Sequence, residues 1–252
     1  MLPPDLRQAE AQLREALNSA LKSNGKGRWT IELRFEGLRL LPLGLRLAEA
    51  LNGEGIQLRV LCPDAGSTAL GRRDHPGLAS LISSLGDHRR LQAQESPEAP
   101  ENGGHPLLVV VGPGPSDYEL VEGVCTGHPG PVVLLNPTLE DGAVGIGSVA
   151  RARRKGFLAP WQAAYALQPF ANGALRRAYP GDWELYRLDP EGFRLAGTFP
   201  QKPSSEEQAE TLSGESPGGL KQQLRGLGDL IDNLQRCPHR CVSLLVPEEE
   251  GL

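Results

Sequence analysis

Apolar positions at the start of the chain switch between helical and strand spacing. A repeat of three or four residues, closed by Asn24-Gly25, predicts an amphipathic helix on Leu6, Ala9, Leu13, Leu17 and Leu21. Residues 29–36 alternate one by one, which is typical of a strand with one buried face, and we expect this strand near a sheet edge. Helical spacing over residues 42–51 and a strand over 56–62 then predict a parallel βαβ pair with a right-handed crossover.

The rest of the chain predicts an α/β sheet with two kinds of strand. Residues 107–111 and 132–135 are apolar without alternation, as expected of central parallel strands covered on both faces. Helices are predicted at residues 78–85 and, as a crossover, at 117–124. Short segments between Pro/Gly turns predict antiparallel strands at 164–167, 183–189 and 193–199. The predicted fold is a Rossmann-like open sheet, mostly parallel in its first half and extended by antiparallel strands.

The chain divides into three parts by composition. Residues 1–202 carry the predicted α/β domain, and residues 203–219 are acidic and rich in Ser, Gly and Pro, which is typical of a linker or a frayed helix. Residues 220–252 contain a predicted C-terminal amphipathic helix and a short tail. The apolar face of that helix can pack on the domain or on another protein, and packing on the domain is the favoured interpretation.

Composition narrows the class of protein. The chain has 252 residues, 39% of them hydrophobic, a net charge of -5 and a pI of about 5.6. An acidic chain argues against a general nucleic-acid binder, because phosphate binding needs a broad basic face. No apolar run reaches the roughly 18 residues of a membrane span, and the first residues lack the pattern of a signal or transit peptide. We therefore expect a soluble cytoplasmic protein.

A basic window stands out against this acidic background. Residues 142–181 contain no Asp or Glu, but they contain Arg151, Arg153, Arg154, Lys155, Arg176 and Arg177. Such a local excess of positive charge predicts contact with an anion, and Ser148 can cap a helix that places Arg151 and Arg154 on one face. Guanidinium groups suit an anionic partner and ion pairs within the fold equally well, with Glu140, Asp141, Asp182 or Glu184 as internal candidates.

Ligands of open α/β sheets bind beyond the carboxyl ends of the parallel strands, and three loops are predicted there. The first loop and its helix offer an anion site on Asp64, Gly66, Ser67, Thr68, Arg72 and Arg73, although a helix-capping role for Asp64 or Ser67 is favoured. The second loop, residues 112–117, lets a ligand approach glycine backbone, but its prolines lack N–H donors. The third begins at Asn136 and leads into the basic window.

Catalytic and metal-binding patterns are weak. The five histidines lie mostly in polar loops, no serine or cysteine lies in a nucleophile elbow, and only Asp64 and Asp141 are carboxylates near predicted strand ends. Cys237, His239 and Cys241 do not have the usual zinc-ligand spacing, so we expect no metal there and leave their role open. No cofactor and no nucleic-acid partner are expected.

Several stretches, taken in order, resemble one protein family. They are residues 2–5, 29–33, 64–66, 70–74, 134–137, 151–153, 165–167 and 176–185, with Asn136-Pro137 and Tyr179-Pro-Gly-Asp-Trp183 as the most specific pieces. They resemble the uncharacterised domain-of-unknown-function family of cyanobacteria and chloroplasts. Its plant members include the low photosystem II accumulation assembly factor, and another member extends a chloroplast adenylate kinase. The resemblance covers about residues 2–205.

The resemblance implies a cyanobacterial protein that takes part in the assembly or maintenance of photosynthetic complexes, in the cytoplasm or peripheral to the thylakoid membrane. It supplies no catalytic residues, and the chain has no adenylate-kinase P-loop. The leading hypothesis is a non-catalytic factor that binds an acidic protein segment, such as one of a photosystem subunit, or an anionic surface through the basic window and Asn136. The alternatives are a nucleotide- or phosphometabolite-binding domain, with the anion between the Asp64 loop and the same arginines, and a scaffold built on the C-terminal helix.

Overall fold

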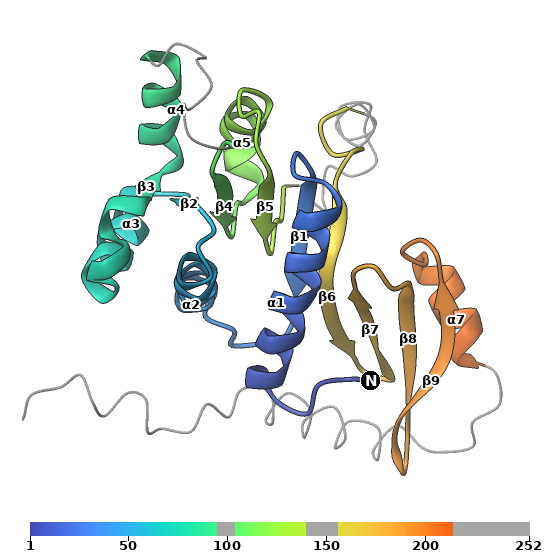
Figure 1. Cartoon of the computed structure of the whole chain (residues 1–252). Helices are drawn as coiled ribbons and strands as arrows, with labels where there is room; N and C mark the ends of the chain where they lie inside the picture. Colours follow the sequence, from blue (N-terminus) through green and yellow to red (C-terminus); the bar gives the residue numbers. More distant parts are fainter. Residues whose placement is uncertain (95–103, 140–155, 214–252) are drawn as a thin grey trace, which may run out of the picture.

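One open sheet organises the chain. In the computed structural model, which describes residues 1–94, 104–139 and 156–213, nine strands follow the order β3-β2-β4-β5-β1-β6-β7-β8-β9 (Figure 1). Six strands pair in parallel: β1 (Arg28–Leu33), β2 (Leu58–Cys62), β3 (Ile82–Ser84), β4 (Leu107–Val111), β5 (Val132–Leu135) and β6 (Gln162–Phe170). Antiparallel pairing continues the sheet from β6 through β7 (Gly173–Ala178), β8 (Trp183–Asp189) and β9 (Gly192–Phe199). The predicted Rossmann-like mixed sheet is confirmed.

Helices cover the two faces of the sheet unequally. On one face, which we call the α1 face, α1 (Leu6–Ser23) and α2 (Leu40–Gly53) pack on the central strands, and α1 crosses in front of them in Figure 1. On the other face, the α5 face, α5 (Tyr118–Thr126) packs on β4 and β5, and α7 (Ser205–Ser213) packs on the antiparallel end. The remaining elements near β2 and β3 are α3 (Ala65–Asp74), α4 (Leu85–Gln94) and a 3-10 turn, Pro76–Leu81; a second 3-10 turn, Pro115–Asp117, directly precedes α5.

The helices predicted from three-to-four spacing form for the expected reasons. Asp5 caps α1 by accepting a hydrogen bond from the Gln8 N–H at 2.7 Å, and Asn24 ends it with an N–H donated to the Ala20 carbonyl. Its leucine and alanine stripe is buried against the sheet. The predicted helices at residues 42–51 and 117–124 correspond to α2 and α5, and the two continuous apolar runs are the fully buried β4 and β5.

The position predicted for the first strand is wrong. β1 is the fifth of the nine strands rather than an edge strand, and its neighbours are β5 and β6. Its one-by-one alternation arises because one side packs under α1 while the other side lines a cleft described below. β1 and β2 are parallel but do not pair, because β5 and β4 lie between them. The two strands of the predicted βαβ unit therefore belong to the same sheet, but they are not neighbours in it.

Two further expectations differ from the structure. Residues 78–85 do not form one helix: a 3-10 turn, β3 and the start of α4 occupy them, since Pro76 and Gly77 favour a turn and β3 pairs with β2. The strand predicted at residues 164–167 is the middle of β6, which is parallel to β1 and antiparallel to β7. β7 itself was missed because its Arg176 and Arg177 were assigned to the basic window.

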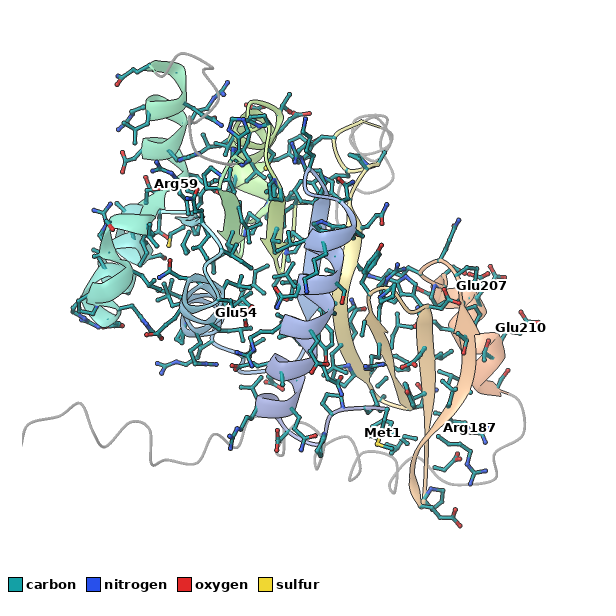
Figure 2. All side chains as sticks on the ribbon, viewed as in Figure 1. Met1, Glu54, Arg59, Arg187, Glu207 and Glu210 are labelled. Atoms are coloured by element: carbon teal, nitrogen blue, oxygen red, sulfur yellow. The ribbon has the colours of Figure 1, made fainter. Side chains whose placement is uncertain are left out.

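The segment after Pro203 begins with a helix. α7 occupies the first half of the predicted linker and buries Leu212 against the antiparallel strands. Its outward side carries Glu207 and Glu210, labelled in Figure 2. The predicted helix in residues 220–252, with Cys237, His239 and Cys241, lies outside the described residues, as do Arg151, Arg153, Arg154 and Lys155. Within the described ranges, no helix has both the length and the apolar character that crossing a membrane requires.

Candidate functional site

A cleft of about 990 Å³ lies on the α5 face of the sheet, between the parts covered by α5 and by α7. Its floor comes from β1, β5, β6 and the residue that follows β1, with Thr30, Glu32, Arg34, Leu134, Gln162 and Ala163. One wall is formed by loop residues after β5 and before β6: Pro137, Thr138, Leu139, Leu158, Ala159 and Trp161. The opposite wall is formed by Arg177, Trp183, Pro200, Gln201 and Lys202.

The register of the strands explains why these side chains lie together around one cleft. Glu32 pairs across the sheet with Ala166, Ala166 with Arg177, and Arg177 with Trp183, so the four residues form one row on the same face. A second row joins Leu134, Thr30 and Ala163. In both rows β6 contributes only an alanine. The short side chains of β6 leave the space that larger residues on β1, β7 and β8 surround.

The wall on the α5 side is aromatic. Tyr118 of α5 packs edge-on against Phe157, with ring centroids 5.9 Å apart, and Phe157 packs in the same way against Trp161 at 5.5 Å. Leu139 and Leu158 belong to the same buried cluster. The indole Nε1 of Trp161 is buried and has no hydrogen-bond partner among the described residues. This end of the cleft therefore offers apolar, largely aromatic surface.

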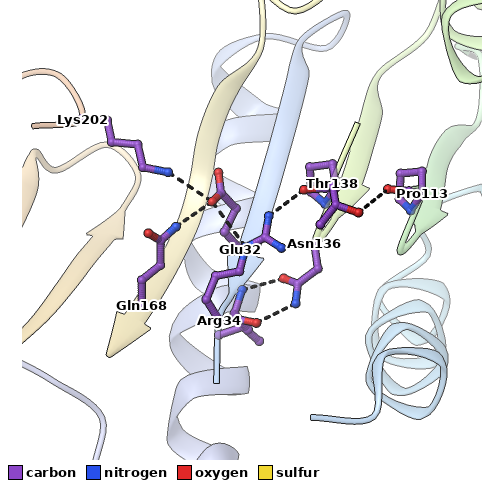
Figure 3. A network of polar contacts seen from close by, with 9 residues as sticks. Glu32, Arg34, Pro113, Asn136, Thr138, Gln168 and Lys202 are labelled. Carbon is purple, nitrogen blue, oxygen red and sulfur yellow. Dashed lines mark hydrogen bonds and ion pairs between the residues drawn. The ribbon is translucent and has the colours of Figure 1, made fainter. Parts of the chain in front are cut away.

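Glu32 is the centre of a polar network on the floor (Figure 3). Its Oε2 accepts hydrogen bonds from Gln168 Nε2 at 2.6 Å and Lys202 Nζ at 3.2 Å, and lies 3.8 Å from Arg34 Nε. Arg34 also donates through Nη2 to the Pro137 carbonyl at 2.6 Å. Lys202, which follows β9, is thereby connected to the central strand β1. Among the described residues that line the cleft, one carboxylate faces three cations, because Arg177 adds to Arg34 and Lys202.

Arg176 and Arg177, both predicted as partner-binding residues, point to opposite faces of β7. Arg176 forms an ion pair with Glu184 at 2.6 Å and donates to Gln12 of α1 at 3.2 Å, with its side chain only 12% exposed. Burial opposes ionisation of Glu184, but the hydrogen bonds from Arg176 and Tyr186 lower the pKa of that carboxyl overall. The same carboxylate helps to raise the pKa of Tyr186, after burial, to about 12. Arg176 is therefore bound within the fold.

Arg177, by contrast, lines the cleft. Its guanidinium carbon lies 5.7 Å from the centre of the Trp183 ring, and Lys202 Nζ lies 5.3 Å from the same ring. Burial lowers the pKa of Arg177, against the opposing effect of Asp182 and Tyr179. Its Nε has no hydrogen-bond partner among the described residues. An arginine remains charged despite such a shift, so Arg177 presents an incompletely paired cation to the cleft.

The side chain of Asn136 joins two strand ends. Its Oδ1 accepts from the Leu33 N–H and its Nδ2 donates to the Leu33 carbonyl, both at 2.6 Å. Its backbone has φ of 48°, a left-handed conformation that asparagine tolerates better than most residues. Thr138, two residues later, donates its N–H to the Pro113 carbonyl at 2.9 Å. The predicted loop at Asn136 is thus held at the cleft, while the amide of Asn136 is occupied by backbone.

The Asp64 loop lies elsewhere and is satisfied internally. Asp64 caps α3: it accepts from the Ser67 N–H and hydroxyl, both at 2.8 Å, and these bonds lower its pKa. The Thr68 hydroxyl donates to the Asp64 carbonyl, and Arg72 donates twice to the Ile82 carbonyl. Arg73 pairs with Asp74. β2, which ends at this loop, is five strand positions from β7, or about 24 Å, so the structure does not bring Gly66 and its neighbours near Arg177.

A second group of titratable residues lies at the other end of the strands. Arg28, the first residue of β1, donates to the carbonyl oxygens of Cys125, His128 and Gly130. His128 Nε2 lies 2.8 Å from the Pro106 carbonyl, and burial lowers the pKa of His128 to about 4. Burial also raises the pKa of Cys125 to about 12. These contacts join α5 to the strands.

The residues that sequence reasoning missed are Glu32, Arg34, Trp161, Trp183 and Lys202. Glu32 and Arg34 were visible as the polar side of an alternating strand, which was interpreted as solvent-facing. Trp161 lies inside the basic window, where the arginines drew attention. Trp183 and Lys202 are separated from Arg177 by turns, so only the register of the antiparallel strands places them together. Among the described residues, no three His, Cys, Asp or Glu side chains converge as a metal site would require.

The fold and the cleft define an α/β open-sheet protein whose sheet carries, on one face, a cleft lined by arginine, lysine and indole side chains. The chain belongs to the family described as domain of unknown function DUF1995, which it matches over residues 3–210. That range includes all the strands and every residue of the cleft. No curated protein and no solved structure matched the chain.

Proposed function

We propose that this protein is a non-catalytic assembly or regulatory factor of the photosynthetic apparatus of a cyanobacterium, and that its cleft binds an acidic segment of a partner protein. The observation that carries the proposal is Arg177, a half-buried guanidinium that lines the cleft beside the Trp183 ring and whose Nε has no hydrogen-bond partner among the described residues. Lys202 and Arg34 add positive charge beside it. The photosynthetic role is an expectation from the sequence resemblance.

Charge and group chemistry favour an acidic protein segment. Carboxylates form strong hydrogen bonds with guanidinium and ammonium groups, and such groups are typical anchors of protein interfaces. The lining residues come from strands and connecting loops, and none of them lies in a described helix. A nucleotide, in contrast, is usually held by N–H groups at the start of a helix. At α3, where such a site was considered, Asp64 and Arg72 are already engaged.

The cleft includes Arg177 of the basic window, and the remaining arginines of the window are close to other cleft residues in the sequence. Leu139 and Leu158 line the cleft, and residues 140–155, which contain Arg151, Arg153 and Arg154, connect these two places in the chain. We propose that these arginines bind the same partner. They lie outside the described residues, so this part of the proposal is carried by their position in the sequence and by their charge.

The test uses the full chain as bait in cyanobacterial extracts, with a carbodiimide that joins amines to carboxylates in direct contact. We expect Lys202 to cross-link to an Asp- or Glu-containing peptide of a photosynthetic-complex protein. The double variant Arg177→Glu/Lys202→Glu and the triple variant Arg151→Glu/Arg153→Glu/Arg154→Glu should lose that partner. Arg7→Glu, an exposed arginine on α1 at the other face of the sheet, is the matched control and should retain it.

Recovery of the same proteins by wild type and by the Arg177→Glu/Lys202→Glu variant would contradict the proposal. A thermal-shift screen with nucleotides and sugar phosphates covers the competing class of ligand. A ligand at a concentration a hundredfold above its dissociation constant adds about 2.7 kcal/mol to the free energy of unfolding. A shift with one of these compounds that disappears in the same double variant would assign the cleft to a small phosphorylated ligand instead.

A further inference from the structure

We propose that the cleft recognises an extended peptide through two subsites, one for an apolar side chain beside Trp161 and one for a carboxylate at Arg177, four residues apart in the peptide. This inference rests on the proposed function and specifies the partner's sequence pattern. It follows from the unequal chemistry of the two ends of the cleft and from the strand register that separates them.

The apolar subsite lies over the row of Leu134 and Ala163. Leu139, Leu158 and the Trp161 ring surround it, and the nearby Phe157 and Tyr118 rings hold Trp161 in place. Ala163 on the floor has a methyl group where a larger residue would close the space. An aliphatic side chain of three or four carbons suits such a site, since its burial there removes apolar surface from water.

The carboxylate subsite lies over the row of Ala166 and Arg177. Arg177 lines the cleft with its charged guanidinium beside the Trp183 ring, and Lys202 lies over the same ring. Glu32 keeps Lys202 and Arg34 in place on the floor, at 3.2 Å and 3.8 Å, and within the described residues it forms no hydrogen bond or ion pair with Arg177. A peptide carboxylate is therefore drawn to Arg177 first, with Lys202 within reach of the same group.

Register gives the distance between the subsites. Glu32 is two residues beyond Thr30 on β1, so the Arg177 row lies about 7 Å further along the strands than the Ala163 row. Arg177 is one strand away from Ala163 and three strands away from Leu134, or about 5 to 14 Å across the sheet. The subsites are thus between about 9 and 16 Å apart.

In an extended peptide, only one spacing between the apolar and the acidic residue matches the distance between the two subsites. Side chains alternate along such a peptide, so only residues separated by an even number of positions point to the sheet together, and each position adds about 3.3 Å. Two positions span about 7 Å, four about 13 Å and six about 20 Å. Four positions fit the separation of the subsites, and three positions would turn one of the two side chains away from the cleft.

The experiment measures dissociation constants by NMR titration of the full chain with acetylated, amidated octapeptides of serine. The probe with leucine at position 2 and glutamate at position 6 is compared with three controls: glutamate at position 5, leucine replaced by serine, and glutamate replaced by glutamine. We expect the first peptide to bind about tenfold more tightly than each control, since a hydrogen-bonded charge and a buried aliphatic chain each change affinity by about this factor or more.

Two protein variants assign the subsites. Arg177→Ala should remove the difference between the glutamate and glutamine peptides, and Ala163→Leu should remove the difference between the leucine and serine peptides while retaining the preference for glutamate. Thermal unfolding of both variants checks that they are folded. Equal binding of the four-position and three-position peptides, or an unchanged leucine preference in Ala163→Leu, would overturn the inference.

The outcomes also separate the inference from the proposed function. If all glutamate peptides bind in an Arg177-dependent manner without regard to leucine, the two-subsite inference fails and the acidic-segment proposal stands. If no peptide binds, while vesicles of phosphatidylglycerol or a nucleotide perturb the Trp161 and Trp183 signals, both fail, and the cleft is assigned to a lipid headgroup or a small phosphorylated ligand respectively.

Discussion

Neighbouring arginines on β7 have opposite roles. Arg176 joins Glu184 and Gln12 beneath α1, whereas Arg177 lines the cleft beside Trp183, and its Nε has no hydrogen-bond partner among the described residues. A strand places successive side chains on opposite faces, so two identical residues meet different surroundings. The sequence left ion pairing and partner binding equally open for these arginines. In the structure, Arg176 forms an ion pair within the fold, and Arg177 is available to a partner in the cleft.

Alanine substitution should separate the two arginines by stability. Arg176→Ala leaves the partly buried carboxylate of Glu184, whose side chain is 27% exposed, without its cation, so we expect the free energy of unfolding to fall by about 1.5–3 kcal/mol. Arg177→Ala loses only a stacked, partly exposed side chain and should cost less than about 1 kcal/mol. Urea unfolding of the two variants at neutral pH measures both values, and equal losses would contradict the assignment of roles.

At the scale of elements, short connections at strand ends determine how the sheet closes around the cleft. Asn136 ties the end of β5 to the end of β1 through two hydrogen bonds to Leu33, and Thr138 ties the same loop to Pro113 after β4. At the opposite ends of the strands, Arg28 and His128 tie α5 to β1 and to the segment before β4. The sheet floor is therefore fixed at both ends by polar side chains.

Replacing Asn136 by alanine should destabilise the fold. The N–H and the carbonyl of Leu33 are buried beside Asn136 and would lose their partner, and an alanine tolerates a positive φ less well, so we expect a loss of about 2–4 kcal/mol. Thr138→Ala is the control in the same loop, because it removes only a hydroxyl contact of 3.3 Å. Denaturant unfolding should show a much smaller effect for Thr138→Ala than for Asn136→Ala.

The free energy of unfolding should decrease as the pH is lowered from 7 to 5, because His128 is buried in the folded state. Burial, together with the nearby Arg28, His88 and His105 charges, lowers its pKa from 6.5 to about 4 in the folded state, while the Pro106 carbonyl opposes this shift. Between these two values the unfolded chain binds a proton that the folded chain does not, so stability decreases as pH falls through this range. We expect a loss of about 1–2 kcal/mol between pH 7 and pH 5.

His128→Gln provides the comparison, since glutamine can still donate a hydrogen bond but does not titrate. Unfolding curves collected at intervals of half a pH unit should show a smaller loss for this variant over the same range. A slope identical to that of wild type would show that other groups carry the acid sensitivity.

At the scale of the whole molecule, the two faces of the sheet are covered differently. The α1 face is covered by α1 and α2 and holds the largest buried cluster, which includes Trp29. The α5 face is covered at its two ends, and the cleft lies between them. Residues from β1 to the segment after β9 contribute to that cleft, so it exists only when the parallel and antiparallel halves are joined through β6.

Variants that retain a single tryptophan should show on which face of the sheet an acidic peptide binds. The chain has three tryptophans, of which Trp29 is buried under α1 and Trp161 and Trp183 line the cleft. Titration with an acidic octapeptide should change the fluorescence of Trp29→Phe/Trp161→Phe, which retains Trp183. It should leave the emission of Trp161→Phe/Trp183→Phe, which retains Trp29, unchanged. A comparable response from Trp29 would place the ligand at another face.

The amino-acid sequence determined the elements whose signals are local: α1 with its Asp5 cap, the apolar runs of β4 and β5, the α/β class and the membership of the family. Periodicity and capping depend on residues a few positions apart, so they can be recognised along the chain. Strand order and register depend on pairing between distant segments. For that reason only the tertiary structure placed β1 at the centre, turned Arg176 and Arg177 to opposite faces, and assembled Glu32, Trp161, Trp183 and Lys202 around one cleft.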